Sequence, residues 1–274
     1  MKVMDVTTTI GEEFDGISDI YDSTRQPATE LELKAVSSEL GNCRMILDVG
    51  VGTGRFAKPL SDMGFEIIGI DVSRKMMLRA RQKGVKNLIL ADAHNMPFTD
   101  GSFDASIIIH VLHLIPDWLN VVREMGRVTK SRVAALLRNR QKESTTASNI
   151  SDSASASSPA FPELWTRYAQ LREEMGYPLR RNRRMWQNEE EIRSKLPPMR
   201  LVKVSDEVVS VSVSDLAMRF QQRTHPSTQD VPREVNEKIV QRLLTEAASA
   251  LGEKPLKRRV VEELAVWRPD QLRC

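Results

Sequence analysis

Short apolar runs separated by helix-compatible segments dominate the first half of the chain. Five of these runs show no regular polar alternation: Met45 to Val49, Glu66 to Ile70, Leu88 to Ala91, Ala105 to His110 and Arg132 to Leu137. A strand with one face in water would alternate polar and apolar residues, whereas continuous apolar runs indicate burial on both faces. Strands of this kind that alternate with helices predict a doubly wound α/β fold, with a mostly parallel sheet covered by helices on both faces.

The second half of the chain adds two strand patterns and two helical segments. Met199 to Val213 alternates polar and apolar residues, and Arg258 to Trp267 is a further strand pattern. These two strands bring the predicted sheet to seven. Helical patterns cover Asp215 to Arg223 and Pro232 to Leu251.

A segment of different composition separates the two halves. Gln141 to Pro159 is dominated by Ser, Thr and Ala, so it has few large apolar side chains to offset the entropy of ordering and is interpreted as a linker or mobile loop. An aromatic and basic helical stretch (Phe161 to Gly176), a basic turn (Pro178 to Arg184) and a short helix (Asn188 to Leu196) follow. We interpret this region as a helical insertion or cap.

Composition and charge point to no unusual class of protein. The 274 residues are 41% hydrophobic and 28% charged, with a formal net charge of +3, so no polyanionic partner is indicated. Two distant cysteines, Cys43 and Cys274, make a disulfide framework improbable and fit a reducing compartment. Met1 to Gly16 lacks the features of a signal peptide, and Ile107 to Ile115 is far shorter than the roughly 20 residues of a membrane span. We therefore expect a cytoplasmic protein without a membrane helix.

A glycine-rich loop follows the first predicted strand. Its sequence is Asp48-Val-Gly50-Val-Gly52-Thr-Gly54, and a helix-compatible segment begins at Arg55. Glycines let a backbone turn sharply and approach a ligand where a Cβ would collide, and a following helix offers unpaired N–H groups. A dinucleotide fingerprint would need glycine at position 55, and no Gly-Lys-Ser/Thr of a P-loop is present. The loop therefore indicates a nucleotide-like cofactor other than NAD.

Two carboxylates follow the next two predicted strands. Asp71 lies 21 residues after Gly50, close to the roughly 20-residue spacing at which an acid binds a ribose hydroxyl pair. Asp92 follows the third strand. The carboxyl ends of parallel strands share one edge of the sheet, which is where open α/β sheets bind ligands. Asp71 can alternatively cap the helix that begins near Ser73, and Asp92 can cap a turn before Pro97.

These residues resemble the class I S-adenosylmethionine (SAM) dependent methyltransferases, in particular their small-molecule members. The resemblance covers Asp15 to Asn139 and includes three further motifs, namely Leu90-Ala-Asp92-Ala-His94-Asn-Met-Pro97-Phe98, Gly101-Ser-Phe103-Asp104 and His110-Val-Leu-His113-Leu-Ile-Pro. It departs from the family at Thr129-Lys-Ser-Arg132, where a glycine pair is usual. The resemblance implies a Rossmann-like fold and SAM as the cofactor, and no metal ligands are predicted.

The resemblance also implies roles for individual residues. Asp48, Gly50, Gly52 and Gly54 would surround the amino acid part of SAM, with Tyr21 and Arg25 at its carboxylate, Asp71 at the ribose, Val72 and Met76 at the adenine face, Asp92 and Ala93 at the adenine edge and His110 beside the sulfonium. Residues 1–30 would cover the cofactor and substrate, 31–140 form the SAM-binding core, 141–198 the linker and insertion, and 199–274 complete the sheet and cap.

Several further residues have two interpretations each. His110 and His225 are candidate general bases, although His225 also fits a surface loop, and His113 fits a hydrogen-bonded core position. The cluster Arg180, Arg181, Arg183 and Arg184 can meet a phosphate or carboxylate, although charge runs are usually solvated. Trp165, Tyr168 and Trp186 can line a pocket, but packing of the insertion is the favoured interpretation.

The predicted function is methyl transfer to a small organic acceptor by in-line displacement at an O, N or C nucleophile. In such a reaction the protein mainly aligns the reacting atoms and excludes water, and a base helps when the acceptor is a hydroxyl. An RNA or protein methyltransferase is the alternative enzyme, although no nucleic-acid-binding module accompanies the Arg cluster. A non-catalytic SAM-binding regulator is the alternative from another class. A monomer or a homodimer is expected, with no nucleic acid or membrane partner.

Overall fold

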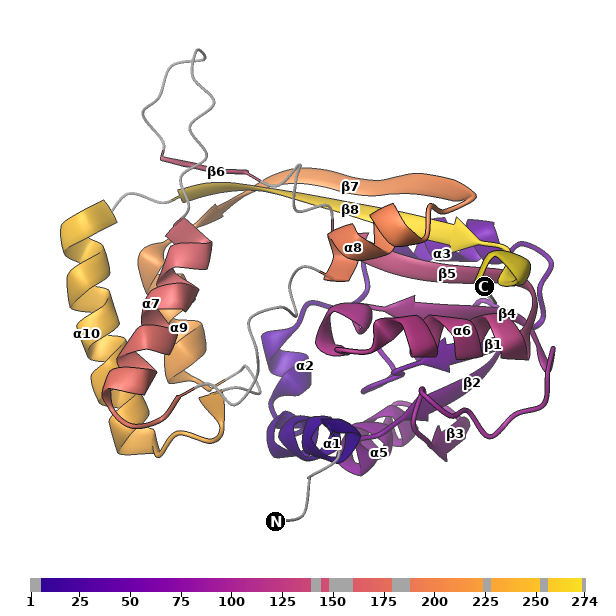
Figure 1. Ribbon diagram of the computed structural model, residues 1–274, viewed down its shortest axis with the longest axis horizontal. Helices are drawn as coiled ribbons and strands as arrows, with labels where there is room; N and C mark the ends of the chain where they lie inside the picture. Colours follow the sequence, from indigo (N-terminus) through magenta and orange to yellow (C-terminus); the bar gives the residue numbers. More distant parts are fainter. Residues whose placement is uncertain are drawn as a thin grey trace. The chain divides into compact units, whose positions relative to one another are not determined.

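The computed structural model divides the chain into two compact units, which are described separately (Figure 1). The first unit comprises Met1–Arg138, Arg183–Ser205 and Glu262–Cys274, and the second comprises Asn139–Asn182 and Asp206–Val261. The structure describes residues 6–138, 144–147, 160–178, 188–223, 228–251 and 256–272.

Five parallel strands form the centre of the sheet and confirm the predicted doubly wound fold. They are β1 (Met45–Val49), β2 (Glu66–Asp71), β3 (Asn87–Leu90), β4 (Phe103–Ile109) and β5 (Thr129–Arg138), in the order β3-β2-β1-β4-β5. β8 (Leu256–Trp267) continues the sheet antiparallel to β5, from the pair Val133 and Trp267 to the pair Arg138 and Glu262.

The described sheet has eight strands rather than the seven expected. β7 (Arg200–Val211) and the four-residue β6 (Ser144–Ala147) both pair with β8, and β6 is the additional strand. β6 falls within the stretch interpreted as a linker. The remainder of that stretch, residues 141–143 and 148–159, lies outside the described residues.

Both faces of β1 and β4 are buried, as their continuous apolar sequences predict. The same prediction was wrong for β3, which lies at the edge of the sheet and whose Ile89 and Leu90 are 38% and 56% exposed. Leu47 and Ile108 belong to one hydrophobic cluster, whereas their neighbours Ile46 and Ile107 belong to another. Helix α6 (Trp118–Val128) packs into the first cluster, and α3 (Glu30–Leu40) and α4 (Ala57–Asp62) pack into the second (Figure 1). The other helices of this unit are α1 (Val6–Ile17), α2 (Tyr21–Thr24), α5 (Arg74–Gln82), α8 (Asn188–Lys195) and the short 3₁₀ turns η1 (Leu112–Leu114) and η4 (Pro269–Leu272).

Hydrogen bonds between side chains and backbone fix the starts of two helices beside the sheet edge. Thr29 Oγ1 accepts a bond from the Glu32 amide at 3.2 Å, and the Thr29 amide donates to Glu32 Oε2 at 2.6 Å, which is a capping box at the start of α3. Ser73 Oγ accepts from the Met76 amide at 3.2 Å and caps α5. The cap of α5 is therefore Ser73 and not Asp71, which leaves the Asp71 carboxylate at the end of β2.

The second unit is a helical assembly with its own core. α7 (Ala160–Glu174), α9 (Val213–Gln221) and α10 (Arg233–Leu251) pack together around Tyr168 and Phe220, whose rings stack with their centroids 4.3 Å apart. Trp165 packs against the same cluster. Trp165 and Tyr168 thus serve the packing of the helical region, as favoured above, whereas Trp186 lies outside the described residues. The predicted insertion is distributed over both units, because α8 belongs to the first and α7 to the second.

Among the described residues, none of the helices combines the length and the apolar character that crossing a membrane requires.

Candidate functional site

A cavity lies at the carboxyl ends of β1, β2 and β4, within the first unit. The cavity opens to solvent, and its space is about 1070 Å³ when the open mouth is included. Its wall includes these predicted cofactor residues: Tyr21, Asp48, Gly50, Gly52, Asp71, Val72, Met76, Asp92, Ala93 and His110. Arg25 and Gly54, the other two predicted residues, are not among the residues that line the cavity.

The glycine loop turns from β1 back toward the sheet edge. The amides of Gly50 and Val51 donate to the Ile70 carbonyl at 2.9 and 3.0 Å, which ties the loop to the end of β2. A Cβ on Gly50 would lie 2.7 Å from Val111 Cγ2, so this glycine is required by close packing. A Cβ on Gly52, at φ 53°, would have only the Gly50 carbonyl within 4 Å. Gly52 therefore presents bare backbone to the cavity, where a ligand can approach it closely.

Gly54, the third glycine of the loop, is also required by close packing. A Cβ at this position would lie 2.7 Å from Val85 Cγ2 and 3.2 Å from the Ala80 side chain. Gly54 thus allows the loop to pack against the end of α5.

The Asp71 carboxylate is held in place by backbone amides. Oδ2 accepts a bond from the Gly52 amide at 2.8 Å, and Oδ1 accepts from the Ser73 amide at 2.8 Å. Burial raises the pKa of Asp71, and these amides oppose the increase. A carboxylate oxygen can accept more than one hydrogen bond, so Asp71 retains capacity for a pair of ligand hydroxyls.

Asp48, at the end of β1, is the second buried carboxyl group in the wall. Only 3% of the residue is exposed, and burial together with the charge of Asp71 raises its pKa to about 7. Of the two carboxyl groups, Asp48 holds the proton in mildly acidic solution, because the amides of Gly52 and Ser73 stabilise the ionised form of Asp71. A ligand with a positive charge beside Asp48 would favour loss of that proton.

Asp92 combines the two roles that its sequence position suggested. Oδ1 accepts from the His94 amide at 2.9 Å and lies 2.7 Å from His94 Nδ1, so the side chain shapes the turn after β3. Asp92, Ala93 and His94 also all line the cavity. His94 was not predicted as a site residue, although it lies within the motif that identified Asp92.

The N-terminal segment is bound to the glycine loop and to α5. Asp22 Oδ1 accepts from Thr53 Oγ1 at 2.7 Å, and Asp15 Oδ1 accepts from the Lys75 amide at 2.9 Å. These contacts place Tyr21 in the cavity wall. The guanidinium of Arg25 lies 5.3 Å from the centroid of the Tyr21 ring, a cation–π arrangement.

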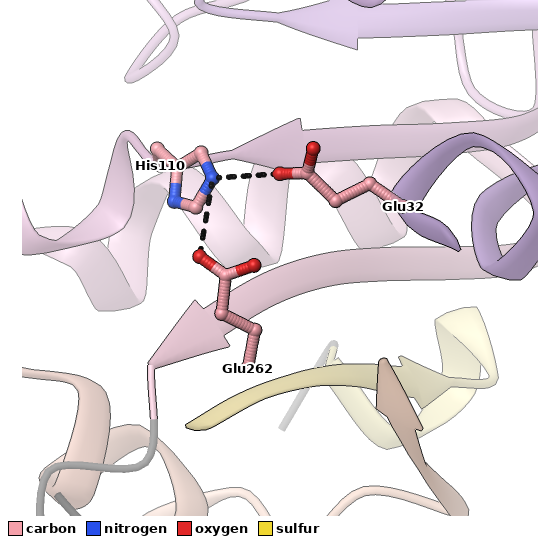
Figure 2. A group of neighbouring side chains, drawn as sticks. All are labelled: Glu32, His110 and Glu262. Carbon is pink, nitrogen blue, oxygen red and sulfur yellow. Dashed lines mark hydrogen bonds and ion pairs between the residues drawn. The ribbon is translucent and has the colours of Figure 1, made fainter. Parts of the chain in front are cut away.

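His110 lies at the end of β4 between two glutamates (Figure 2). Its Nε2 is 3.5 Å from Glu32 Oε1 and 4.0 Å from Glu262 Oε1. Its φ is 56°, which is uncommon for any residue other than glycine. His113 instead lies with its Nδ1 3.8 Å from Glu189 Oε1, outside the cavity wall.

An arginine neutralises each of these two glutamates. Arg55 pairs with Glu32 at 3.0 Å, and Arg138 Nε lies 3.6 Å from Glu262 Oε1. Burial would raise the pKa of Glu32, but hydrogen bonds from His110 and Thr29 and the charge of Arg55 outweigh burial and lower it to about 2. Glu32 is therefore ionised at neutral pH.

Sequence reasoning missed Glu32, Arg55 and Glu262. The pattern Thr29-x-x-Glu32 is a capping-box signal that predicts the start of α3, but it says nothing about a cavity. Glu262 reaches the site only because β8 returns from the far end of the sequence to pair with β5. Other predicted residues, namely His225, Arg180, Arg181, Arg183 and Arg184, lie outside the described residues.

Comparison with known proteins identifies the central segment. Residues 47–137 match the family described as a methyltransferase domain. A demethylmenaquinone methyltransferase of Renibacterium salmoninarum is 32% identical over 126 residues, which cover 43% of this chain and 52% of that protein. A phosphatidylethanolamine N-methyltransferase of Cereibacter sphaeroides is 37% identical over 92 residues, covering 31% of this chain and 45% of that protein.

The chain thus matches about half or less of the length of these curated relatives. Among solved structures, the YcgJ protein of Bacillus subtilis is similar over 86% of this chain and 97% of its own, with 19% identity and a TM-score of 0.49. The match over residues 47–137 covers the glycine loop, Asp71, Asp92 and His110. Over residues 47–137 the chain therefore matches a methyltransferase domain, with SAM as the cofactor.

Proposed function

We propose that the chain is an enzyme that transfers the methyl group of SAM to a small organic acceptor carrying an O, N or C nucleophile. The observation that supports this most is the cavity at the sheet edge, where the bare backbone of Gly52 and the Asp71 carboxylate lie side by side. SAM, when bound, supplies a methyl carbon activated by the neighbouring sulfonium.

The wall of the cavity suits the separate parts of this cofactor. Gly50 and Gly52 would adjoin its amino acid part together with Asp48, and Asp71 would accept hydrogen bonds from the ribose hydroxyls. Val72 and Met76 would face the adenine. The remaining assignments are Asp92 and Ala93 at the adenine edge, Tyr21 and Arg25 at the methionine carboxylate, His110 beside the sulfonium and Gly54, with the other two loop glycines, at the amino acid part.

The protein's contribution to the reaction is alignment in a site that excludes water. Alignment of reacting groups can supply on the order of 7 to 11 kcal/mol of the barrier reduction. Ile10, Phe14, Leu114 and Ile115 form apolar parts of the wall near the polar ones. These side chains keep solvent away from the reacting atoms and leave His110 as a basic side chain near them.

Calorimetry with SAM and with its demethylated product, S-adenosylhomocysteine, tests the cofactor site. We expect the wild type to bind both and Asp71→Ala to bind each at least tenfold more weakly, because a charged acceptor of two hydrogen bonds is lost. Asp62→Ala is the control, since it removes an exposed carboxylate that pairs with Lys58 on the same helix. Absence of binding to the wild type would contradict the proposal.

The acceptor is identified by a transfer screen with labelled SAM. The panel contains small hydroxy, amino and thiol compounds, vesicles of phosphatidylethanolamine and total RNA. Transfer to a small hydroxy or amino compound supports the proposal, whereas transfer to thiols alone would replace the proposed O, N or C acceptor atom with sulfur. Transfer to RNA alone would replace it.

A further inference from the structure

Three side chains from distant parts of the sequence meet at the carboxyl edge of β4. Figure 2 shows Glu32 of α3 and Glu262 of β8 both directed at the same nitrogen of His110, Nε2. In Figure 2 the dashed lines from both carboxylates end on Nε2, and none ends on the other ring nitrogen, Nδ1. His110 is also part of the cavity wall.

The backbone of His110 has a conformation that residues other than glycine seldom adopt. Its φ of 56° lies in the left-handed region, and such strain persists only where the surroundings maintain it. Val111, the next residue, packs against Gly50 of the cofactor loop. The ring is thus oriented both through its backbone and through the carboxylates at Nε2.

The charges around the ring determine which nitrogen carries the proton. Glu32 is ionised, because hydrogen bonds and Arg55 together lower its pKa to about 2 against the effect of burial. An ionised carboxylate can only accept hydrogen bonds, so the ring nitrogen that faces it must be the donor. A neutral His110 therefore carries its hydrogen on Nε2, which leaves a lone pair on Nδ1.

We infer that Glu32 and Glu262 are positioning residues that fix the tautomer of His110 and make its Nδ1 the general base of the methyl transfer. His110 takes the acceptor's proton at Nδ1 while the acceptor atom bonds to the methyl carbon and the electron pair of the methyl–sulfur bond remains on sulfur. The imidazolium formed in this step faces the two carboxylates, which stabilise its charge. This inference rests on the function proposed above.

The same three side chains also meet the spacing of a metal site, since their donor atoms all lie within 4.8 Å of one another. Arg55 and Arg138 already pair with the two carboxylates, however, so a cation would compete with both guanidinium groups. The observed pairing favours the histidine–carboxylate arrangement. Metal binding becomes an outcome of the test.

The tautomer is read directly by long-range ¹H–¹⁵N NMR of the full chain labelled at histidine nitrogen. The His110 signals are those lost in His110→Gln. We expect a protonated Nε2 and an unprotonated Nδ1 in the wild type, and a mixture of tautomers in Glu32→Gln and Glu262→Gln. Glu189→Gln is the matched control, because it makes the same change beside His113 and leaves His110 unaffected. A His110 tautomer that is protonated on Nδ1 in the wild type would overturn the inference.

Mn²⁺ added to the same sample tests the metal alternative. Broadening of the His110 signals at stoichiometric Mn²⁺, reversed by EDTA, would overturn the inference, and unchanged signals support it. Glu32→Gln and Glu262→Gln are both tested, so that the inference remains testable if one of them does not fold. Far-UV circular dichroism checks the fold of each.

Kinetics with an acceptor from the screen separate positioning from binding. A positioned base contributes roughly 10² to 10⁴-fold to the rate, so His110→Gln should lower kcat by about that factor and Glu262→Gln by at least tenfold, with SAM binding retained. Wild-type kcat in Glu262→Gln and Glu32→Gln would refute the inference and leave the proposed function intact. Failure of the wild type to bind SAM would instead refute the proposed function.

Discussion

Replacing Asp48 with asparagine should stabilise the cofactor-free protein, by an amount that grows with pH. In the folded protein the pKa of Asp48 is about 7, against 3.8 for an unperturbed carboxyl group, because of burial and the charge of Asp71. Between these two values the folded state retains a proton that the unfolded chain has released. The stability of the wild type therefore falls as the pH rises through this window and levels off above about 7.

The magnitude follows from the separation of the two pKa values. About three pKa units at 1.36 kcal/mol each correspond to roughly 4 kcal/mol when Asp48 is fully ionised. Asparagine keeps the shape of the side chain and cannot ionise. The difference in the free energy of unfolding between Asp48→Asn and the wild type should therefore increase by about 2 kcal/mol from pH 5 to pH 7, where the folded group is half ionised.

Urea unfolding at pH 5, 6, 7 and 8 measures this difference, followed by the fluorescence of buried tryptophans that include Trp118 and Trp267. Asp104→Asn is the control. Amides of Met45 and Arg44 lower the pKa of Asp104, so its ionisation is complete well below pH 5 and the effect of its replacement should not vary over this range. A difference between Asp48→Asn and the wild type that is independent of pH would show that Asp48 is ionised throughout, and would refute the reasoning.

Three further predictions concern other parts of the chain. Gly52→Ala should lower the free energy of unfolding by about 1–2 kcal/mol, because of its positive φ, and should weaken SAM binding. Gly50→Ala should lower the free energy of unfolding further, because its Cβ also collides with Val111. Thermal unfolding measures the stability of both variants, and calorimetry measures SAM binding. The pKa of Glu32 is lowered from 4.5 to about 2, so its ionisation contributes about 3 kcal/mol to the free energy of unfolding above pH 4.5, and this contribution is lost as the pH falls toward 2. In urea unfolding between pH 5 and pH 3, Glu32→Gln should not show this loss. In the second unit, Tyr168→Phe should cost about 1 kcal/mol in urea unfolding, because the hydroxyl donates to Asn236 Oδ1 at 2.5 Å.

The strands were predictable because their signal is local. β1 was predicted with its observed bounds, and β2, β4 and β5 within a few residues, since strands buried on both faces have continuous apolar sequences. β6 was missed because Ser144–Ala147 has no apolar pattern, and it is a strand only because β8 offers it an antiparallel partner. Its pairing is a property of the fold rather than of its own sequence.

The candidate site likewise contains residues that the sequence predicts and residues that only the fold brings to it. Gly50, Gly52 and Asp71 follow strands at fixed spacings, so they were found from the sequence, and the structure places them in the cavity wall. Glu32 and Glu262 have no such spacing. The Glu32 carboxylate reaches His110 from α3 and the Glu262 carboxylate reaches it from β8, so only the folded chain brings the three side chains together.

The Glu32 carboxylate has one oxygen for the helix and one for the site. Oε2 accepts the Thr29 amide at the start of α3, and Oε1 accepts Arg55 and lies beside His110. A shorter aspartate would not span both groups, and a glutamine would lose the charge that Arg55 neutralises. Natural variation at position 32 is therefore tied to variation at 29, 55 and 110, so we expect these four positions to change together among homologous sequences although they are far apart along the chain.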